Sequence, residues 1–198
     1  MRGLLPGERG AAIALLARGM LDNPLNIAAY GQDAERRERS LQRMFTKMFR
    51  VFTAQQPLAA MDGEVLVGVA GIAPPGTCQP GPLQRLRFLP GMVTLGPGAA
   101  ARVARWLAAW GERDPEQSHY HLGPVAVEPR LRGHGIGSQL IQVHCHQLDA
   151  AGDASYLETD KHENVAFYQR HGYQVVAQEN VIGIPNWFMS RQPGHATR

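Results

Sequence analysis

The chain has 198 residues, of which 44% are hydrophobic and 19% charged, a composition typical of a globular domain with a sizeable core. The net charge is +3 and no run of lysine and arginine residues is present, so the sequence does not indicate a nucleic-acid-binding tail. Two cysteines make no disulfide framework, and no apolar segment has the length of a signal peptide or a membrane span. We therefore expect one cytoplasmic domain over residues 1–198, a monomer or homodimer that binds neither nucleic acid nor membranes.

The N-terminal quarter of the chain predicts two helices. Residues 8–20 place apolar side chains at helical positions, and Pro24 interrupts the pattern. Asp33 suits the N-cap of a second helix. We expect the charged residues 36–39 in its first turns to be solvated. The apolar residues of this helix recur every three or four positions, which predicts core packing of Leu41, Met44, Phe45, Met48, Phe49 and Phe52.

A hairpin, a loop and a third helix are predicted next. Asp62-Gly63 is a favoured two-residue turn, so strands are expected on both sides of it, over residues 58–72. Residues 73–90 are rich in proline and glycine and predict a loop, which at this length is usually functional or mobile. Residues 99–110 predict a helix that ends before Gly111.

The stretch around which the chain is organised is residues 119–138, which predicts a strand, a tight turn and a helix. Val125 and Val127 alternate in the strand, and Pro129 ends it. The helix begins near Gly135 and continues with apolar residues at helical spacing.

The turn between this strand and helix favours an anionic ligand. Its glycines lack Cβ atoms, so the backbone can turn sharply and a ligand can come close (Gly133, Gly135 and Gly137). Free N–H groups at a helix start attract an anion such as a pyrophosphate. Arg130 and Arg132 add positive charge beside them.

The C-terminal part predicts three short strands and one helix. Asn164 can cap the helix, which runs through Tyr168 to His171, and Gly172 fits its C-terminal stop. Residues 191–198 predict a frayed tail. The strands are expected over residues 154–159, 173–177 and 184–190.

The glycine turn resembles the acyl-CoA-binding motif of the GCN5-related N-acetyltransferases (GNATs), Arg/Gln-x-x-Gly-x-Gly/Ala. Two overlapping registers fit, one from Arg130 to Gly135 and one from Arg132 to Gly137, and the preceding Val-Ala-Val-Glu-Pro favours the first. The resemblance implies that acetyl-CoA is held by the strand backbone and the turn, over Val125, Ala126, Val127, Arg130, Arg132, Gly133, His134, Gly135, Ile136, Gly137 and Ser138.

A second motif resembles the same family. It is Asn164-x-x-x-Tyr168 within a segment that ends Phe-Tyr-x-x-x-Gly-Tyr173, where the family usually ends in Phe. The two motifs cover about residues 118–173, the expected CoA-binding core, and the second adds Asn164 and Phe167 to the implied CoA contacts. The resemblance implies a single-domain α/β (α+β) fold, with a mixed, mostly antiparallel sheet flanked by helices and splayed open where CoA enters.

Acetyl transfer to an amine needs a polarised thioester carbonyl, a base for the amine and an acid for the thiolate. The resemblance implies that Tyr168 is the acid; without the resemblance, a helix tyrosine packed on the core is the favoured interpretation. For the base, Glu158 and His121 rank above His119. His119 and His121 lie two apart on a strand, so both point to one face. A purely structural, hydrogen-bonded role remains open for each histidine.

Metal and dinucleotide sites are not expected. His144 and His146 are two apart on a helix and do not share a face, and no ligand set has a recognisable spacing. The pattern from Gly133 to Gly137 lacks the third glycine of a dinucleotide fold, and too little chain follows it.

The acceptor is predicted to be a small amine. The segments expected on the acceptor side are residues 21–30, 73–90 and 184–188, which are apolar and carry Asp22 as their one carboxylate. Whether Trp187 lines the pocket or belongs to the core stays open. The alternatives are acetylation of a protein lysine or N-terminus near Asp22, and an acyl-CoA sensor without turnover.

Overall fold

The protein is described from a computed structural model, which describes residues 1–194. One seven-stranded sheet has the order β1-β2-β3-β4-β5-β7-β6. Every neighbouring pair is antiparallel except β4 and β5, which are parallel. This is the mixed, mostly antiparallel sheet with flanking helices that the sequence predicted. The strands are β1 (Arg2–Gly3), β2 (Leu58–Asp62), β3 (Val65–Ala73), β4 (Tyr120–Val127), β5 (Ser155–Thr159), β6 (Gln174–Val181) and β7 (Ile184–Arg191).

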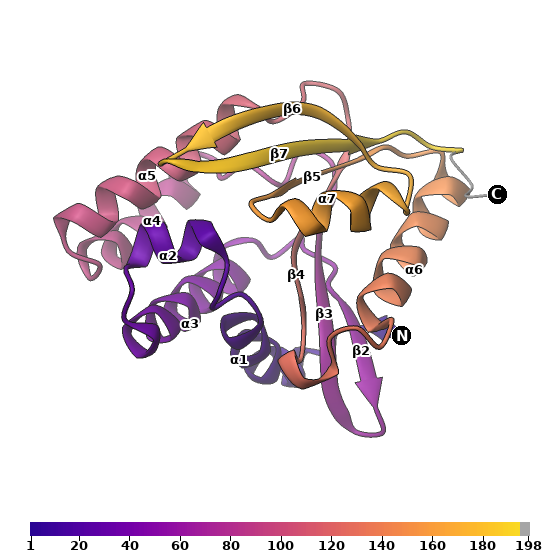
Figure 1. Cartoon of the computed structure of the whole chain (residues 1–198), viewed down its shortest axis with the longest axis horizontal. Helices are drawn as coiled ribbons and strands as arrows, with labels where there is room; N and C mark the ends of the chain where they lie inside the picture. The colour runs from indigo at the N-terminus through magenta and orange to yellow at the C-terminus, as the bar shows by residue number, and fades with distance from the viewer. Residues whose placement is uncertain (195–198) are drawn as a thin grey trace.

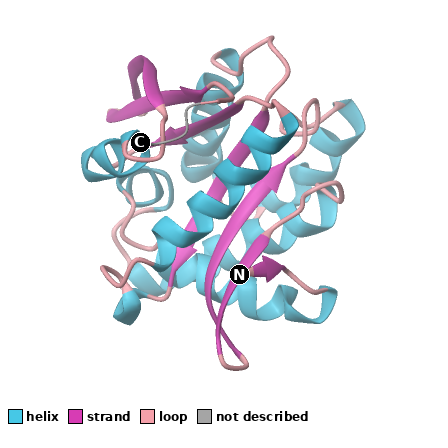
Figure 2. Ribbon diagram, turned by 90° about the vertical axis from the view of Figure 1, so that its right-hand side faces the viewer, coloured by secondary structure: helices cyan, strands magenta, loops and turns pink. Residues whose placement is uncertain are grey.

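The helices lie on the two faces of this sheet. On one face are α1 (Arg9–Gly19), α2 (Pro24–Tyr30), α3 (Ala34–Val51) and α5 (Pro97–Glu112), and on the other are α6 (Ile136–Ala151) and α7 (His162–Gln169). Figure 2 shows α6 lying across the strands of the β2–β4 half. Short elements complete the chain: the 3₁₀ turns η1 (Pro6–Glu8) and η2 (Pro129–Leu131), and α4 (Pro82–Val93), which packs against α3 and α5. Among the described helices, none combines the length and apolar content that a membrane crossing requires.

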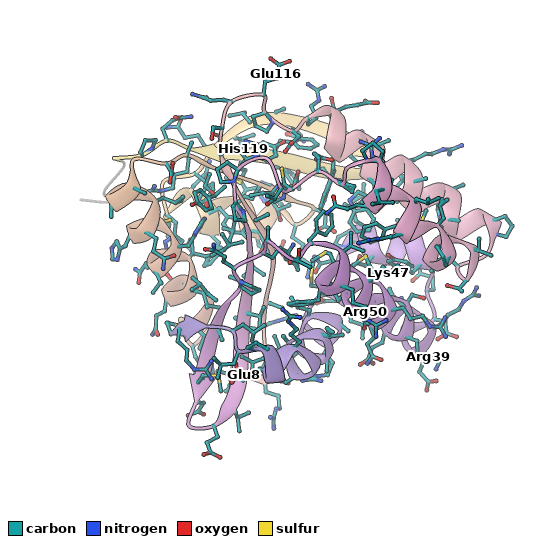
Figure 3. The ribbon with its side chains drawn as sticks, turned by 180° about the vertical axis from the view of Figure 1, so that it is seen from behind. Glu8, Arg39, Lys47, Arg50, Glu116 and His119 are labelled. Carbon is teal, nitrogen blue, oxygen red and sulfur yellow. The ribbon has the colours of Figure 1, made fainter. Side chains whose placement is uncertain are left out.

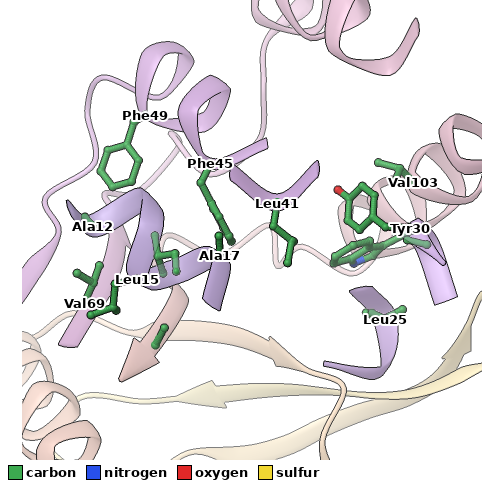
Figure 4. Close-up of a cluster of buried hydrophobic side chains, with 14 of the residues drawn as sticks. Ala12, Leu15, Ala17, Leu25, Tyr30, Leu41, Phe45, Phe49, Val69 and Val103 are labelled. Atoms are coloured by element: carbon green, nitrogen blue, oxygen red, sulfur yellow. The ribbon is translucent and has the colours of Figure 1, made fainter. Parts of the chain in front are cut away.

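The core consists of one apolar cluster on each face, because adjacent strand residues point to opposite sides. Tyr156 belongs to the cluster beneath α1, α2, α3 and α5, whereas its neighbour Leu157 belongs to the cluster beneath α6 and α7. Figure 4 shows the first cluster, in which the predicted stripe of the second helix contributes Leu41, Phe45 and Phe49. Asp33 caps that helix, as predicted, by accepting a hydrogen bond from the Arg36 N–H at 3.0 Å.

The two halves of the sheet separate between β4 and β5. These strands pair only at Tyr120 with Ser155 and at His121 with Tyr156. Beyond His121, β4 remains paired with β3 as far as Val127. In Figure 1, β5–β7 run across the top while β2–β4 descend from the same junction. The divergence leaves the β5-facing edge of residues 122–127 without a strand partner within the described part of the chain, as the family resemblance implied.

The structure differs from the prediction at two prolines, each of which begins a helix. Pro24 does not simply interrupt helical structure; it is the first residue of α2. The predicted loop over residues 73–90 contains the start of α4, which begins at Pro82. In both cases proline occupies the first helical turn, where its fixed φ is favourable and no N–H partner is needed. The apolar side chains of α4 are largely exposed, so no periodic buried stripe marked this helix.

Two predicted boundaries were off by a short distance. The hairpin turn is at Gly63-Glu64, one residue later than expected, with Asp62 paired to Val65 and Gly63 at φ 57°. Asn164 does not cap α7, which begins two residues earlier; its amide donates to the Thr159 hydroxyl at 3.1 Å.

Two arginines expected to be solvated are buried. Arg37 donates to the carbonyls of Leu21 and Gly31, at 2.7 and 2.6 Å, and so holds both ends of the α2 segment. Arg191, predicted to begin a frayed tail, is the last residue of β7, and its side chain is 2% exposed. Its guanidinium donates two hydrogen bonds of 2.8 Å to the carboxylate of Asp149. The remaining tail prediction, for residues 195–198, lies outside the described residues.

Candidate active site

The point where β4 and β5 separate brings two of the candidate bases together. His121 is the last β4 residue that pairs with β5, and Glu158 lies two residues beyond its partner. His121 Nε2 and Glu158 Oε2 are 3.0 Å apart, and the Glu158 side chain is 2% exposed. Glu158 shares a sheet face with Tyr156, whose ring packs against His121 at 5.8 Å. A carboxylate and an imidazole therefore meet at the apex of the divergence, on the face covered by α5.

His119 lies beside His121, as the spacing predicted, with ring centroids 6.5 Å apart. Both of its ring nitrogens are engaged: Nδ1 is 2.7 Å from the Gln117 carbonyl, and Nε2 is 3.3 Å from Asp114 Oδ1. Hydrogen bonds with Asp114 and Cys78 raise the pKa of His119 to about 10. Burial lowers the pKa of His121, but Glu158 and Cys78 outweigh it and bring that pKa to about 10.

Cys78 and Asp114 complete this group, and the sequence did not single out either residue. The Cys78 thiol is 3.4 Å from Asp114 Oδ2 and 4.0 Å from His119 Nε2. Burial raises the pKa of Cys78, but His119 and His121 lower it more. The chain positions of Cys78 and Asp114, in separate loops before α4 and after α5, carried no motif. Four groups with metal-ligating atoms thus converge where sequence spacing indicated no metal site.

Tyr168, the candidate acid, lies on the other face of the sheet. It is a buried residue of α7, in the apolar cluster that includes Leu157 and Tyr173. Its ring centroid is 5.1 Å from that of Phe167 and 5.8 Å from that of Tyr173. Burial raises the pKa of Tyr168, so its hydroxyl keeps its proton at neutral pH. The candidate base and acid therefore lie on opposite faces of the sheet.

The predicted anion-binding turn lies at the far end of β4. Gly133 and Gly135 have φ of 83° and 79°, and Gly135 is the N-cap of α6. The first N–H groups of a helix have no intrahelical partner, and here they belong to Ile136, Gly137 and Ser138. The motif register favoured by the sequence ends at Gly135, before the helix, whereas the second register extends across the helix start.

The two arginines of the turn differ in their surroundings. The Arg130 side chain is 86% exposed, with Glu128 3.9 Å away. Arg132 donates to the Gly19 carbonyl at 2.5 Å and lies 3.3 Å from Asp22. Lys161 Nζ is also 3.3 Å from Asp22. Burial raises the pKa of Asp22, but the charges of Lys161 and Arg132 lower it by more, so the net shift is downward. The Asp22 carboxylate is therefore held by two cations.

The other predicted cofactor contacts converge near this turn. A Cβ added at Gly137 would lie 3.7 Å from both Phe167 Cζ and Val127 Cγ2, so α7, β4 and the start of α6 meet there. The Ser138 hydroxyl is 2.9 Å from His171 Nε2. His134 is exposed, with Nδ1 3.1 Å from the Arg132 carbonyl. Val125 and Ala126 belong to the part of β4 beyond its last pairing with β5, and Asn164 is bonded to the end of β5.

Two other features singled out from the sequence lie elsewhere. His144 is buried and 3.3 Å from the Ser155 hydroxyl, whereas His146 is exposed, so the two do not share a face, as predicted. Trp187 pairs with Thr159 across β5 and β7, and its ring is 5.5 Å from that of His162.

Comparisons with known proteins agree with this fold. Residues 99–175 match the family model described as an acetyltransferase (GNAT) domain. A Corynebacterium glutamicum structure described as histone acetyltransferase HPA2 and related acetyltransferase superposes with a TM-score of 0.74, at 20% identity over 100% of both chains. An agmatine N-acetyltransferase gives a TM-score of 0.64 at 15% identity, covering 96% of this chain and 97% of that one. An N-acetyltransferase from Staphylococcus aureus gives 0.57 at 14% identity over 96% of each chain. Residues 99–175 therefore match a GNAT acetyltransferase domain, and the whole chain has the fold of solved acetyltransferases.

Proposed function

We propose that the protein is an acetyl-CoA-dependent N-acetyltransferase that acetylates the primary amine of a small molecule by direct transfer. The observation that supports this most strongly is the arrangement along β4. The His121–Glu158 pair lies at the point where β4 and β5 separate, and the α6 N-terminus lies at the other end of the unpaired β4 edge. An extended, anionic thioester such as acetyl-CoA matches this succession of sites.

Binding follows from the backbone. The N–H groups at the start of α6, together with the helix dipole, suit the pyrophosphate. The unpaired edge of β4 offers backbone groups to the pantetheine chain and the thioester carbonyl. Exposed Arg130 is free to approach the phosphates.

The chemistry needs one proton acceptor and one proton donor. Glu158 accepts the amine proton, directly or through a water molecule, as the nitrogen attacks the thioester carbonyl. The C–N bond forms, the C–S bond breaks, and Tyr168 donates its proton to the departing thiolate. The two residues lie on opposite faces of the sheet, which suits an amine that enters on one side and a thiolate that leaves on the other. His121 holds Glu158 in place, and His119 faces Asp114 instead.

The acceptor class is inferred from charge. Asp22, the carboxylate of the predicted acceptor-side segments, is neutralised by Arg132 and Lys161. Asp160 nearby is buried and accepts a 2.7 Å hydrogen bond from the Leu25 N–H. Neither carboxylate is free to attract a basic peptide, and this favours a small amine. Of the similar structures, one is described as acting on agmatine and another as a histone acetyltransferase, so the fold alone does not choose between them.

Thiol release from acetyl-CoA, measured with parallel panels of small amines and basic peptides, tests this proposal. Glu158→Gln should lower turnover by about 100-fold or more, because a positioned base contributes 10²–10⁴-fold. Glu163→Gln, on the exposed first turn of α7, is the matched control and should be unaffected. Acetylation of peptides with no turnover of any small amine would refute the acceptor class. Binding of CoA without turnover of either panel would favour the sensor alternative.

A further inference from the structure

Two segments that are distant in the sequence, one at Cys78 and one at residues 114–121, bring four side chains to one point. Cys78 comes from the loop between β3 and α4, Asp114 from the loop after α5, and His119 and His121 from the start of β4. Figure 3 shows His119 at this position. One ligand atom from each residue lies within 4.8 Å of all the others. The group contains a thiol, a carboxyl and two imidazoles, which are the ligand types that zinc sites use.

The separations match the edges of a small tetrahedron. Bond lengths of about 2.3 Å to sulfur and about 2.0–2.1 Å to nitrogen or oxygen give ligand–ligand distances of about 3.3–3.6 Å in tetrahedral zinc. Cys78 Sγ is 3.6 Å from Asp114 Oδ1, and His119 Nε2 is 3.3 Å from the same oxygen. The distances from Cys78 Sγ to His119 Nε2 and from His121 Nδ1 to Asp114 Oδ1 are both 4.0 Å. The other two separations are within 4.8 Å, so the ligand atoms would have to move inward by about 1 Å or less to complete the polyhedron.

The outward-facing nitrogens of both histidines are already held. His119 Nδ1 is 2.7 Å from the Gln117 carbonyl, and His121 Nε2 is 3.0 Å from the Glu158 carboxylate. Metal-binding histidines usually have this pattern, in which the other ring N–H donates to a carbonyl or carboxylate and so fixes the tautomer. It leaves His119 Nε2 and His121 Nδ1 turned toward Cys78 and Asp114.

His121 Nδ1 supplies an independent sign of a ligand. This atom is buried and has no hydrogen-bond partner within residues 1–194. A buried polar atom without a partner is costly, so such atoms in native structures call for a specific explanation. A metal ion that displaces the proton of this nitrogen satisfies it, whereas Asp114 Oδ1, at 4.0 Å, is too far away for a hydrogen bond.

We propose that Cys78, Asp114, His119 and His121 together bind one Zn²⁺ ion. Thiolate with imidazole selects zinc over the hard cations that prefer oxygen alone. The ion would tie the loops that carry Cys78 and Asp114 to β4. It would also fix His121 with its Nε2–H directed at Glu158, which makes His121 a positioning residue for the proposed base. Binding to the thiolate and neutral imidazoles would release protons to solvent.

Cobalt titration of the full-length, metal-free protein tests the site without any acetyl transfer, so the outcome is separate from the proposed function. Wild-type protein should bind one equivalent of Co²⁺ with intense tetrahedral ligand-field bands and a sulfur-to-cobalt charge-transfer band, both removed by Zn²⁺. Cys78→Ser should abolish the charge-transfer band. Cys145→Ser, the matched control, should retain it, because Cys145 is buried in α6 with Sγ 3.7 Å from the His171 carbonyl.

A second variant and a second measurement keep the proposal testable if Cys78→Ser does not fold. His119→Gln should weaken Co²⁺ binding by at least about tenfold, since loss of even an outer-shell partner costs about 10–100-fold. A chelator should lower the melting temperature of zinc-loaded wild-type protein but not that of His119→Gln. A weak, six-coordinate cobalt spectrum, a charge-transfer band that survives in Cys78→Ser, or chelator-insensitive melting of the wild type would overturn the proposal.

Discussion

Replacement of Gly135 by alanine should separate backbone strain from cofactor binding. Gly135 is the N-cap of α6 and has φ of 79°, a conformation in which an L-residue costs about 1–2 kcal/mol. For a chain of this length, that cost corresponds to a fall of about 2–8 °C in melting temperature. An added Cβ would meet no protein atom within 4 Å, so Gly135→Ala should still fold. The new methyl group instead occupies space beside the helix N–H groups where a pyrophosphate would approach.

Gly152→Ala is the matched control, at the other end of the same helix. Gly152 caps the C-terminus of α6 with φ of 73°, and an added Cβ there also meets nothing within 4 Å. Both variants should lose similar stability in thermal unfolding. Calorimetric titration with CoA should distinguish them. Because a hydrogen bond to a charged group contributes about 1.5–3 kcal/mol, Gly135→Ala should bind CoA about 10–100-fold more weakly, and Gly152→Ala should bind like wild type.

Wild-type CoA affinity in both variants would refute the placement of the phosphate site at the α6 N-terminus. Equal loss of affinity in both would show that strain in α6, and not close approach of the ligand, controls binding. Gly135→Val would then distinguish strain from steric exclusion of the ligand. Its larger side chain should weaken CoA binding beyond the effect of Gly135→Ala only if the side chain blocks the approach of the ligand.

Three further predictions concern Tyr168, the buried imidazole of His144, and the ion pair of Asp149 with Arg191. Tyr168→Phe should lower kcat by about 100-fold while the calorimetric Kd for CoA stays within twofold, because only the hydroxyl is removed; an unchanged kcat would exclude its role as acid. His144 should make the protein acid-sensitive: burial lowers its pKa to about 4, so the unfolded chain takes up the proton first. Its contribution, at most about 3 kcal/mol, is fully present above pH 6.5 and is lost as the pH falls toward 4. Urea unfolding of His144→Gln should show a shallower loss of stability between pH 6.5 and 5, and a slope equal to that of the wild type would contradict this. Asp149→Asn should lower the melting temperature by about 4–12 °C, because it weakens the ion pair with Arg191 at a cost of about 2–3 kcal/mol. In this pair the Arg191 guanidinium is buried and the Asp149 carboxylate is partly exposed. A shift below 1 °C would contradict that reasoning.

Features that depend on neighbouring residues could be read from the sequence. The strand, glycine turn and helix of residues 119–138 form as predicted, because β-branched alternation, a proline stop and glycines with positive φ are local properties. The N-cap at Asp33 and the apolar stripe of α3 follow from local capping and helical spacing. The meeting of His121 with Glu158 also required β4 and β5 to be neighbours, as predicted, and to pair in parallel, which the structure showed.

Long-range contacts decided the features that the sequence did not show. In the sequence, Arg37 and Arg191 look like ordinary solvated charges near the ends of elements. Their partners, two carbonyls for Arg37 and a carboxylate for Arg191, come from other segments of the chain, and only the fold brings them together. Asp22 is neutralised only because the turn after β4 and the loop after β5 bring Arg132 and Lys161 to it.

The convergence of Cys78 and Asp114 on the two histidines is the clearest case of this kind. His119 and His121 share a face because a strand has a period of two, and the sequence alone determines that. No spacing rule connects them with Cys78 or Asp114, since those residues lie in separate loops. The antiparallel pairing of β3 with β4 and the packing of α5 on the sheet set the positions of both loops. Side-chain periodicity is a property of the local backbone, whereas a ligand cluster depends on how distant segments pack, and only the tertiary structure determines that.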